Sequence, residues 1–278
     1  MSNLTRRQMI RTSHGDIAVE ESGSSGLPVL LIHGNSFCRR VFRNQMQGQL
    51  ANNHRLIAFD LPGHGQSANA IDPRRSYTRP GLADAAVELL DKLGFDEGVV
   101  FGWSLGGHIG IEMIPRFPGM RGLMICGAPP VSPNQMSQGF NSSPQLGIAG
   151  KQTLSEAEIN AFVTGIFGDS AEPFLRDAVA RADNRFRQRL FEAARNGEGV
   201  NQRLLVESSP VPLAVVNGGA DRIVNLDYFD TVAYANLWEG RNHRLSSLGH
   251  APFWEAPRDF DPILERFLHD VKSGRSVS

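Results

Sequence analysis

The sequence is poor in cysteine. Only two of its 278 residues are cysteine, and Cys38 and Cys126 stand far apart and outside any CxxC pair. A disulfide framework needs more cysteines than this, and paired thiol motifs are what mark redox or zinc sites. We therefore predict two reduced thiols.

Long apolar runs and a recognisable export signal are also missing. No stretch in the sequence reaches the roughly 18 consecutive apolar residues that suggest a membrane-spanning helix. Arg6 and Arg7 stand near the N-terminus, but the residues that follow them hold no apolar segment of the kind found in signal peptides. The sequence thus predicts no contact with a membrane and a cytoplasmic location.

Neither sign of charge is in excess. Lys and Arg number 28 and Asp and Glu number 29, so the formal net charge is −1. Binding to nucleic acid phosphates needs a basic face, which this balance disfavours. With 41% hydrophobic and 21% charged residues, the composition is that of an ordinary globular protein. A small molecule is the expected partner, and the oligomeric state stays open.

The apolar segments alternate with helical patterns over most of the chain. This alternation predicts an α/β fold with a mostly parallel central sheet and helices on both faces. Leucines and alanines recur at helical spacing over residues 82–93, and Gly94 ends that helix. The predicted strands are GDIAVEE, PVLLIHG, RLIAFD, GVVFGW, RGLMICG and PLAVVNG.

The alternation stops over residues 131–209. This segment contains no convincing strand, but two helical patterns cover residues 155–168 and 173–197. Ser155 followed by Glu158 fits a capping box at the start of the first. We predict a helical cap inserted at 131–209 into an α/β core made of residues 1–130 and 210–278.

Residues 102–106 read G-x-S-x-G between an apolar strand and a helical pattern. In a nucleophile elbow of this kind, the serine sits on a tight strand-to-helix turn that needs small residues on either side of it. The following helix directs its N-terminal amides toward developing negative charge. Ser104 is therefore the predicted nucleophile.

An acid and a histidine follow Ser104 in the order that this architecture requires. Asp221 lies just beyond the buried strand PLAVVNG, and Asp227 is the alternative acid. His250 lies after a short β-like stretch and before a helical segment. A histidine can accept and return a proton near neutral pH. The candidate catalytic residues are Ser104, Asp221 and His250.

The loop after the first central strand holds the candidate second donor of an oxyanion hole. We expect the backbone amides of Asn35 and Leu105 to form that hole, and the Asn35 side chain to contact the substrate. His33 is expected to hold the loop by hydrogen bonds. The glycine-rich stretch DLPGHGQS at residues 60–67 lacks the lysine and spacing of a phosphate-binding loop, and is predicted to be a tight loop below the site.

Four motifs together resemble the α/β-hydrolase superfamily: HGN at 33–35, DLPGHGQS at 60–67, GWSLGG at 102–107 and GHAPFWEAP at 249–257. In finer detail, LIHGNSF, IDPRRSY, VVFGWSLGGHIGIEMI, MRGLMICGAPP, NLWEG and GHAPF look like the serine-dependent N-acyl-homoserine lactonases of this fold. The resemblance implies an enzyme that opens the lactone ring of bacterial quorum-sensing signals without a metal or other cofactor.

That resemblance assigns the roles of nucleophile, base and acid to Ser104, His250 and Asp221. The related enzyme carries a glutamate at the acid position, so aspartate is a conservative departure. A tyrosine that holds the substrate there aligns with Phe162, which has no hydroxyl to donate, and this departure bears on how substrate is bound. The predicted substrate-binding residues are Asn35, Trp103, Phe140, Phe162 and Phe167.

The cap is expected to supply the acyl-chain pocket, and each candidate side chain there could equally pack the cap onto the core. The candidates are Phe140, Leu146, Ile159, Phe162, Val163, Ile166 and Phe167. A metal-dependent lactonase fits poorly, because no HxHxDH cluster occurs among the scattered histidines. Three alternatives remain: a carboxylesterase or carbon–carbon bond hydrolase with the same triad, a cofactor-free dioxygenase, and a non-enzymatic ligand receptor.

Overall fold

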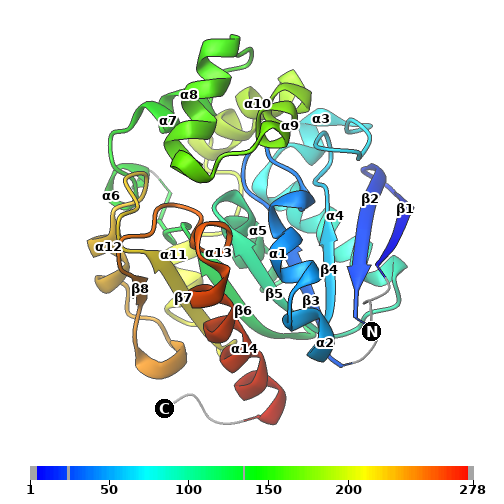
Figure 1. Cartoon of the computed structure of the whole chain (residues 1–278), viewed down its shortest axis with the longest axis vertical. Helices are drawn as coiled ribbons and strands as arrows, with labels where there is room; N and C mark the ends of the chain where they lie inside the picture. Colours follow the sequence, from blue (N-terminus) through cyan, green and yellow to red (C-terminus); the bar gives the residue numbers. More distant parts are fainter. Residues whose placement is uncertain (1–4, 24–25, 134, 275–278) are drawn as a thin grey trace.

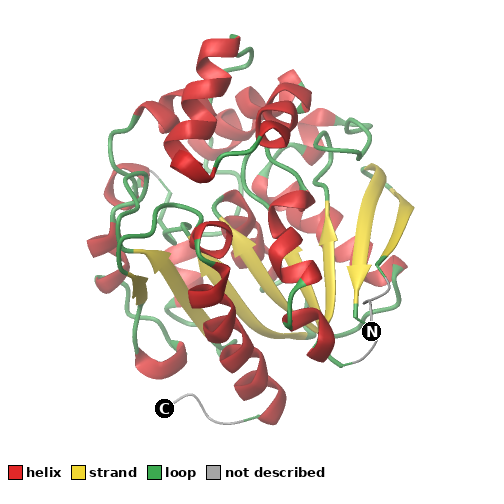
Figure 2. Cartoon of the chain, viewed as in Figure 1, coloured by secondary structure: helices red, strands yellow, loops and turns green. Residues whose placement is uncertain are grey.

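The strands of the computed structural model form one sheet. The structure describes residues 5–23, 26–133 and 135–274, and within them eight strands join side by side (Figures 1 and 2). They are β1 (Arg6–Thr12), β2 (Gly15–Ser22), β3 (Pro28–Ile32), β4 (Arg55–Phe59), β5 (Gly98–Trp103), β6 (Met120–Cys126), β7 (Leu213–Gly218) and β8 (His243–Leu245).

The strand order is β1-β2-β4-β3-β5-β6-β7-β8. The pairs β1–β2 and β2–β4 are antiparallel, and the remaining pairs are parallel. The α/β fold with a mostly parallel sheet is therefore confirmed. Strand β1 was not predicted, because its polar sequence RRQMIRT leaves most of its residues exposed.

Two layers of helices cover the sheet because alternate residues of each buried strand face opposite sides. Phe101 packs into one core, and its neighbour Val100 packs into the other. The first core is covered by α1 (Arg43–Gln47), α2 (Leu50–Asn53), α13 (Pro252–Glu255) and α14 (Pro257–Ser273). The second is covered by α4 (Arg79–Lys92), α5 (Leu105–Met113) and α12 (Leu226–Asp230), with α3 (Pro73–Ser76) beside them.

The described residues between β6 and β7 contribute no strand to the sheet. Their helices are α6 (Met136–Gly139), α7 (Pro144–Ala149), α8 (Glu156–Phe167), α9 (Pro173–Arg181), α10 (Asn184–Arg195) and α11 (Gln202–Val206). The predicted capping box is present at the start of α8, where Ser155 and Glu158 bond reciprocally. The single helical pattern predicted over residues 173–197 is wrong in one respect, since α9 ends at Arg181 and Asp183 caps a separate helix, α10.

The helices α7 to α10 lie beyond the ends toward which the parallel strands point (Figure 1). Carboxyl ends of parallel strands are where open α/β sheets bind ligands. This arrangement places α7 to α10 on the side of the sheet edge where β5 ends and Ser104 follows Trp103.

Cys38 and Cys126 are free thiols, both buried. Within the described part of the chain, none of the helices combines the length and the apolar character that crossing a bilayer requires.

Candidate active site

Ser104 occupies a strained turn between β5 and α5. Its φ is +54° and its ψ is −118°, a conformation that residues with a side chain rarely adopt and that the surrounding structure must hold in place. Its N–H donates to the carbonyl of Cys126 at 2.7 Å. The strain presents the Ser104 side chain to the space above the sheet.

The glycines on either side of Ser104 are required by close backbone contacts. A Cβ atom on Gly102 would lie 2.2 Å from the carbonyl oxygen of Gly106, and one on Gly106 would lie 1.9 Å from that of Ile32. Both distances are far below van der Waals contact. The G-x-S-x-G spacing thus follows from how tightly α5 returns over β5 and β3.

His250 and Asp221 come together in a buried pair. His250 Nδ1 lies 2.7 Å from Asp221 Oδ2, and the two side chains are 4% and 1% exposed. The other Asp221 oxygen accepts from the N–H of Ile223 at 2.8 Å. Asp227, the alternative acid, has a side chain that is 91% exposed and pairs with Arg244, so Asp221 is the acid that the fold brings to His250.

The main chain around His250 is held from both sides. The indole Nε1–H of Trp103 donates to the carbonyl of His250 at 2.8 Å. The Glu255 carboxylate accepts from the N–H of Gly249 at 2.9 Å and from that of Ala251 at 3.2 Å. These bonds fix the short loop that presents the imidazole.

The loop after β3 lies against Ser104. A Cβ atom on Gly34 would come within 3.3 Å of the Ser104 Cβ, so the adjacent Asn35 belongs to the same small region. Leu105 is the first residue of α5, and the N–H groups of a first helical turn have no acceptor within their helix. The side chain of Asn35 donates to the carbonyl of Ala149 at 3.1 Å, which links it to α7.

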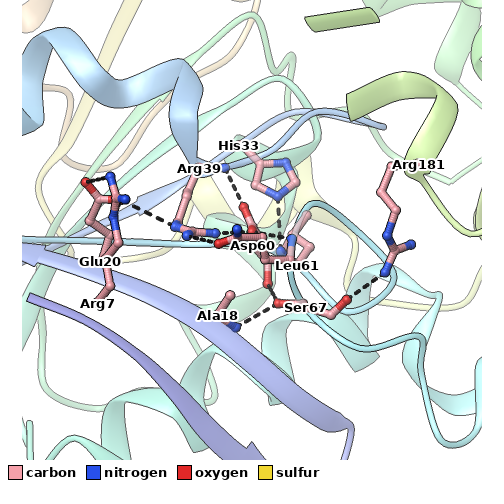
Figure 3. Close-up of polar contacts among 10 residues, drawn as sticks. Arg7, Ala18, Glu20, His33, Arg39, Asp60, Leu61, Ser67 and Arg181 are labelled. Carbon is pink, nitrogen blue, oxygen red and sulfur yellow. Dashed lines mark hydrogen bonds and ion pairs between the residues drawn. The ribbon is translucent and has the colours of Figure 1, made fainter. Parts of the chain in front are cut away.

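His33 connects this loop to the glycine-rich loop at residues 60–67 (Figure 3). Its Nε2 accepts from the N–H of Leu61 at 3.0 Å, and its Nδ1 lies 2.8 Å from the carbonyl of Gly34. Burial lowers the pKa of His33 to about 4, so the ring is neutral near pH 7 and can accept at Nε2 while donating at Nδ1. The structural role predicted for His33 is confirmed by these bonds.

Asp60 organises the same glycine-rich loop from below. Its carboxylate accepts from the N–H and the guanidinium of Arg39 and from the N–H of Gln66. The Ser67 hydroxyl donates to the Asp60 carbonyl at 2.6 Å and accepts from the N–H of Ala18 in β2. Figure 3 shows these residues converging beneath the loop of His33, in accord with a tight supporting loop.

Ser104 and His250 line the wall of one pocket, of about 830 Å³ with part of that space open to solvent. The predicted residues Asn35, Trp103, Leu105, Phe140 and Phe162 line it too. Other lining residues were not identified from the sequence. They are Phe37, Arg79, His108, Met136, Gln145, Ala149, Leu190, Phe191, Ala194 and Ile223.

Part of the expected acyl-chain set lies behind the pocket wall. Leu146 and Ile166 line the pocket, whereas Ile159, Val163 and Phe167 are absent from its lining. Val163 and Phe167 are buried in the hydrophobic core, and the partly buried Ile159 packs against it. Phe167 is 2% exposed and packs edge-on against Phe37. Phe167 therefore packs in the core, where its ring contacts those of Phe37 and Trp103.

Phe162 stacks on Phe37 at the pocket wall, with ring centroids 5.7 Å apart and planes 7° from parallel. No hydroxyl is available at this position.

The sequence did contain an indication that His108 lines the pocket. His108 stands four residues after Ser104, which places it on the same face of α5. Among the described residues, no group of three or more His, Cys, Asp or Glu side chains is placed to hold a metal ion.

Comparisons with known proteins agree with this fold. A model of the alpha/beta hydrolase family matches residues 29–262. The crystal structure of the N-acyl homoserine lactonase AidH complexed with N-butanoyl homoserine is similar to this chain at 48% identity, with a TM-score of 0.94, covering 96% of this chain and 97% of that one.

Two curated relatives are more distant. The dihydrolipoyllysine-residue acetyltransferase component of the acetoin cleaving system from Cupriavidus necator is 27% identical over 79% of this chain, and the match covers only 58% of that protein's length. The 2-hydroxymuconate semialdehyde hydrolase from Pseudomonas sp. strain CF600 is 25% identical, over 91% of this chain and 90% of that protein.

Proposed function

The chain belongs to the alpha/beta hydrolase family, and on that premise we propose that it opens the lactone ring of N-acyl-homoserine lactones. Ser104 is the nucleophile, His250 the general base and Asp221 the acid that orients it. The observation that carries the proposal is the 48% identity with AidH over 96% of the chain, combined with a pocket whose wall includes Ser104 and His250.

The first step uses the buried pair of His250 and Asp221. The 2.7 Å contact at Nδ1 directs the Nδ1–H to the carboxylate, which leaves Nε2 as the proton acceptor. Ser104 Oγ attacks the lactone carbonyl carbon while its proton passes to Nε2. Asp221 keeps the imidazole in this tautomer and stabilises the imidazolium that forms.

The carbonyl oxygen becomes negative as the new bond forms, and two backbone amides face it in this proposal. Those amides are the N–H groups of Asn35 and Leu105, the second at the N-terminus of α5. The positive end of that helix favours an anion there. Removal of one oxyanion donor typically costs roughly 2.7 to 4 kcal/mol of transition-state stabilisation.

The ring then opens at the bond between the carbonyl carbon and the ring oxygen. His250 returns its proton to that oxygen, which becomes a hydroxyl still attached to the acyl-enzyme. Because the leaving alcohol remains tethered, closure of the ring competes with attack by water. Water activated by the same Nε2 releases the N-acyl homoserine and restores the Ser104 hydroxyl.

The helical segment at residues 131–209 forms a cap over this site in our proposal, and residues 1–130 and 210–278 form the core. Cap side chains Phe140, Leu146, Phe162 and Ile166 line the pocket and bound the space for the acyl chain. Since Phe162 has no hydroxyl, the substrate amide is held by groups other than the ring at this position. The cytoplasmic location stays a prediction of the sequence.

Proton release in a weakly buffered indicator assay tests the proposal. Short-chain and long-chain N-acyl-homoserine lactones are offered to the wild type, to Ser104→Ala and to the exposed-site control Ser208→Ala. We expect lactone opening by the wild type and the control, and a loss of about three orders of magnitude or more in Ser104→Ala. Turnover retained in Ser104→Ala would contradict the covalent route.

A second candidate, a carboxylesterase or carbon–carbon bond hydrolase using the same three residues, is favoured by the similarity to the 2-hydroxymuconate semialdehyde hydrolase. An aryl ester assayed alongside the lactones separates the two functions. Rapid ester hydrolysis with inert lactones would support this second candidate.

A further inference from the structure

His108 lines the pocket together with Ser104, but the proposed hydrolysis of the lactone makes no use of it. It is on α5, four residues after the nucleophile, so the two residues share a helical face and are about 6 Å apart along the helix axis. His108 is 8% exposed, and its ring centroid is 5.9 Å from that of Phe140, another residue of the pocket wall. A polar ring therefore lies one helical turn from the nucleophile.

A buried glutamine determines which nitrogen of the His108 ring carries the proton. Nδ1 of His108 lies 2.7 Å from Oε1 of Gln202, and Nε2 of Gln202 donates to the carbonyl of His108 at 3.0 Å. The orientation of the Gln202 amide follows from the second bond, because a backbone carbonyl can only accept. Oε1 therefore accepts from Nδ1–H. Burial lowers the pKa of His108 to about 4, so near pH 7 the ring is neutral and Nε2 is an acceptor.

Nε2 of His108 is open to a ligand. No group in the described part of the chain forms a hydrogen bond to it, and it is not one of the side-chain atoms there that lack both a partner and accessible surface. The acceptor is thus available in the pocket that His108 lines. Asn35 is less suited to this role, since its Oδ1 already accepts from the Ser36 hydroxyl at 2.8 Å.

The amide N–H is the only hydrogen bond donor of a plain N-acyl-homoserine lactone. Its nitrogen is bonded to the carbon next to the lactone carbonyl, so it lies about 2.5 Å from the carbon that Ser104 attacks. The attacking oxygen approaches that carbon to about 3 Å, and a hydrogen bond adds about 3 Å beyond the nitrogen. An acceptor one helical turn from Ser104 is within this reach. Phe162, which has no hydroxyl, leaves the amide to such a group.

We propose that Nε2 of His108 accepts a hydrogen bond from the amide N–H of the substrate. The inference rests on the proposed function, because it takes the lactone carbonyl to be at Ser104. A substrate without this donor removes Nε2 from water and offers it no partner in exchange, which weakens binding. His108 is then a specificity-determining residue that selects lactones with an amide next to the carbonyl.

The test combines two enzymes with two substrates. N-hexanoyl-homoserine lactone is compared with its carba analogue, in which a CH₂ group replaces the amide N–H. Wild type is compared with His108→Asn, whose shorter amide can still donate to Gln202 but has no atom in the place of Nε2. The kcat/KM ratio of amide to carba substrate should be about tenfold lower in His108→Asn. The intrinsic reactivities of the two lactones cancel in this comparison.

Two control variants test whether the effect belongs to His108. His243→Asn makes the same substitution at a buried histidine that does not line the pocket. Gln145→Leu removes another side-chain acceptor from the pocket wall, on α7. Both controls should keep the wild-type ratio. An unchanged ratio in His108→Asn, or an equal fall in either control, would overturn the proposal.

Calorimetric binding of the two ligands to Ser104→Ala separates this inference from the proposed function, and it needs no variant of His108. The amide ligand should bind about tenfold more tightly than the carba analogue. Lactone opening by the wild type with a Kd ratio of one contradicts the role of His108 alone. A tenfold Kd ratio without lactone opening by the wild type contradicts the proposed function alone. Failure of both ligands to bind contradicts both.

Discussion

Glu255 contacts the main chain on both sides of His250 without contacting the imidazole. Its two oxygens accept from the N–H groups of Gly249 and Ala251 at 2.9 and 3.2 Å, and it follows these residues at the end of the short helix α13. A carboxylate can accept both bonds at once, whereas an amide has only one oxygen. Glu255 therefore acts through His250, as a positioning residue.

Glu255→Gln should lower kcat for lactone opening by roughly 10- to 100-fold, because a displacement near 1 Å of a reacting group costs about that much. KM should change little, since Glu255 does not line the pocket. Steady-state kinetics on the purified variant measure both values. Glu265→Gln, which alters a carboxylate on α14 that pairs with His54, is the control, and an equal loss in it would contradict the assignment.

The sequence was sufficient to find Ser104, Asp221 and His250 as candidates because each lies in a local pattern: an elbow, a strand end or a glycine-flanked loop. The sequence was insufficient to identify Arg79 as a pocket residue. Its position there depends on how α4 packs beside α5, and no local sequence pattern predicts the contact between these two helices. Phe167 and Val163 were grouped with pocket residues for a related reason. Helical spacing identifies an apolar face but does not tell which of its side chains reach a cavity and which are covered.

Asp183 joins the helices between β6 and β7 to the rest of the molecule. It caps α10 by accepting from the N–H of Arg185 at 3.0 Å, and it accepts from the Tyr77 hydroxyl at 2.6 Å. Its own N–H donates to the carbonyl of Gly63 in the glycine-rich loop. The pKa of Asp183 is lowered to about 2, because hydrogen bonds from Arg185 and Tyr77 outweigh the opposing effect of burial.

Asp183→Ala should destabilise the protein by about 2 to 4 kcal/mol, the sum of a lost helix cap and a buried Tyr77 O–H left without an acceptor, although the Tyr77 oxygen still accepts from the N–H of Ala70. Urea unfolding at pH 7 measures the change. In the double variant with Tyr77→Phe, the two losses should be less than additive, because both variants remove the same bond. Asp177→Ala, at an exposed position of α9, is the control, and full additivity would contradict the coupling.

Two features at the level of helices and strands escaped prediction for opposite reasons. The pattern over residues 173–197 is continuously helical, and the only sign of the break is the Asp183-Asn184 pair, a preferred helix start that a long amphipathic pattern easily conceals. Strand β1 was missed for the opposite reason. It lies at the edge of the sheet and most of its residues are exposed, so its sequence lacks the alternation of apolar and polar residues that predicts a strand. Its partner β2 determines its position through pairing from Arg6 to Thr12.

The architecture as a whole was predictable to the level of fold class but not of strand order. Alternating strands and helices imply a parallel sheet, and motifs such as GWSLGG specify which strand carries the nucleophile. The order β1-β2-β4-β3-β5-β6-β7-β8 depends on pairings between distant segments, for which no local pattern exists. Packing between distant segments also buries histidines, among them His33, His64 and His108.

These histidines make the stability of the fold depend on pH. Burial lowers the pKa of His33 and of His108 to about 4 and that of His64 well below its usual value. The unfolded chain takes up protons on them below about pH 6.5 while the folded chain does not, so acidification favours unfolding. Asp261 opposes this effect, because burial raises its pKa to about 6 and the folded state then binds its proton first.

These three histidines outweigh Asp261, while the lowered pKa values of His14 and His243 act in the same sense and the raised pKa of Glu112 acts in the opposite one. The free energy of unfolding should therefore fall by about 3 to 5 kcal/mol between pH 7.5 and pH 5.0, at about 1.4 kcal/mol per proton and pH unit. Urea unfolding across this range measures the slope. His64→Gln removes one of the three groups and should reduce the slope by about one proton, whereas His269→Gln, at an exposed position of α14, should leave it unchanged. A slope of zero in the wild type would mean that the unfolded chain gains no more protons than the folded one, which buried neutral imidazoles at His33, His64 and His108 do not permit.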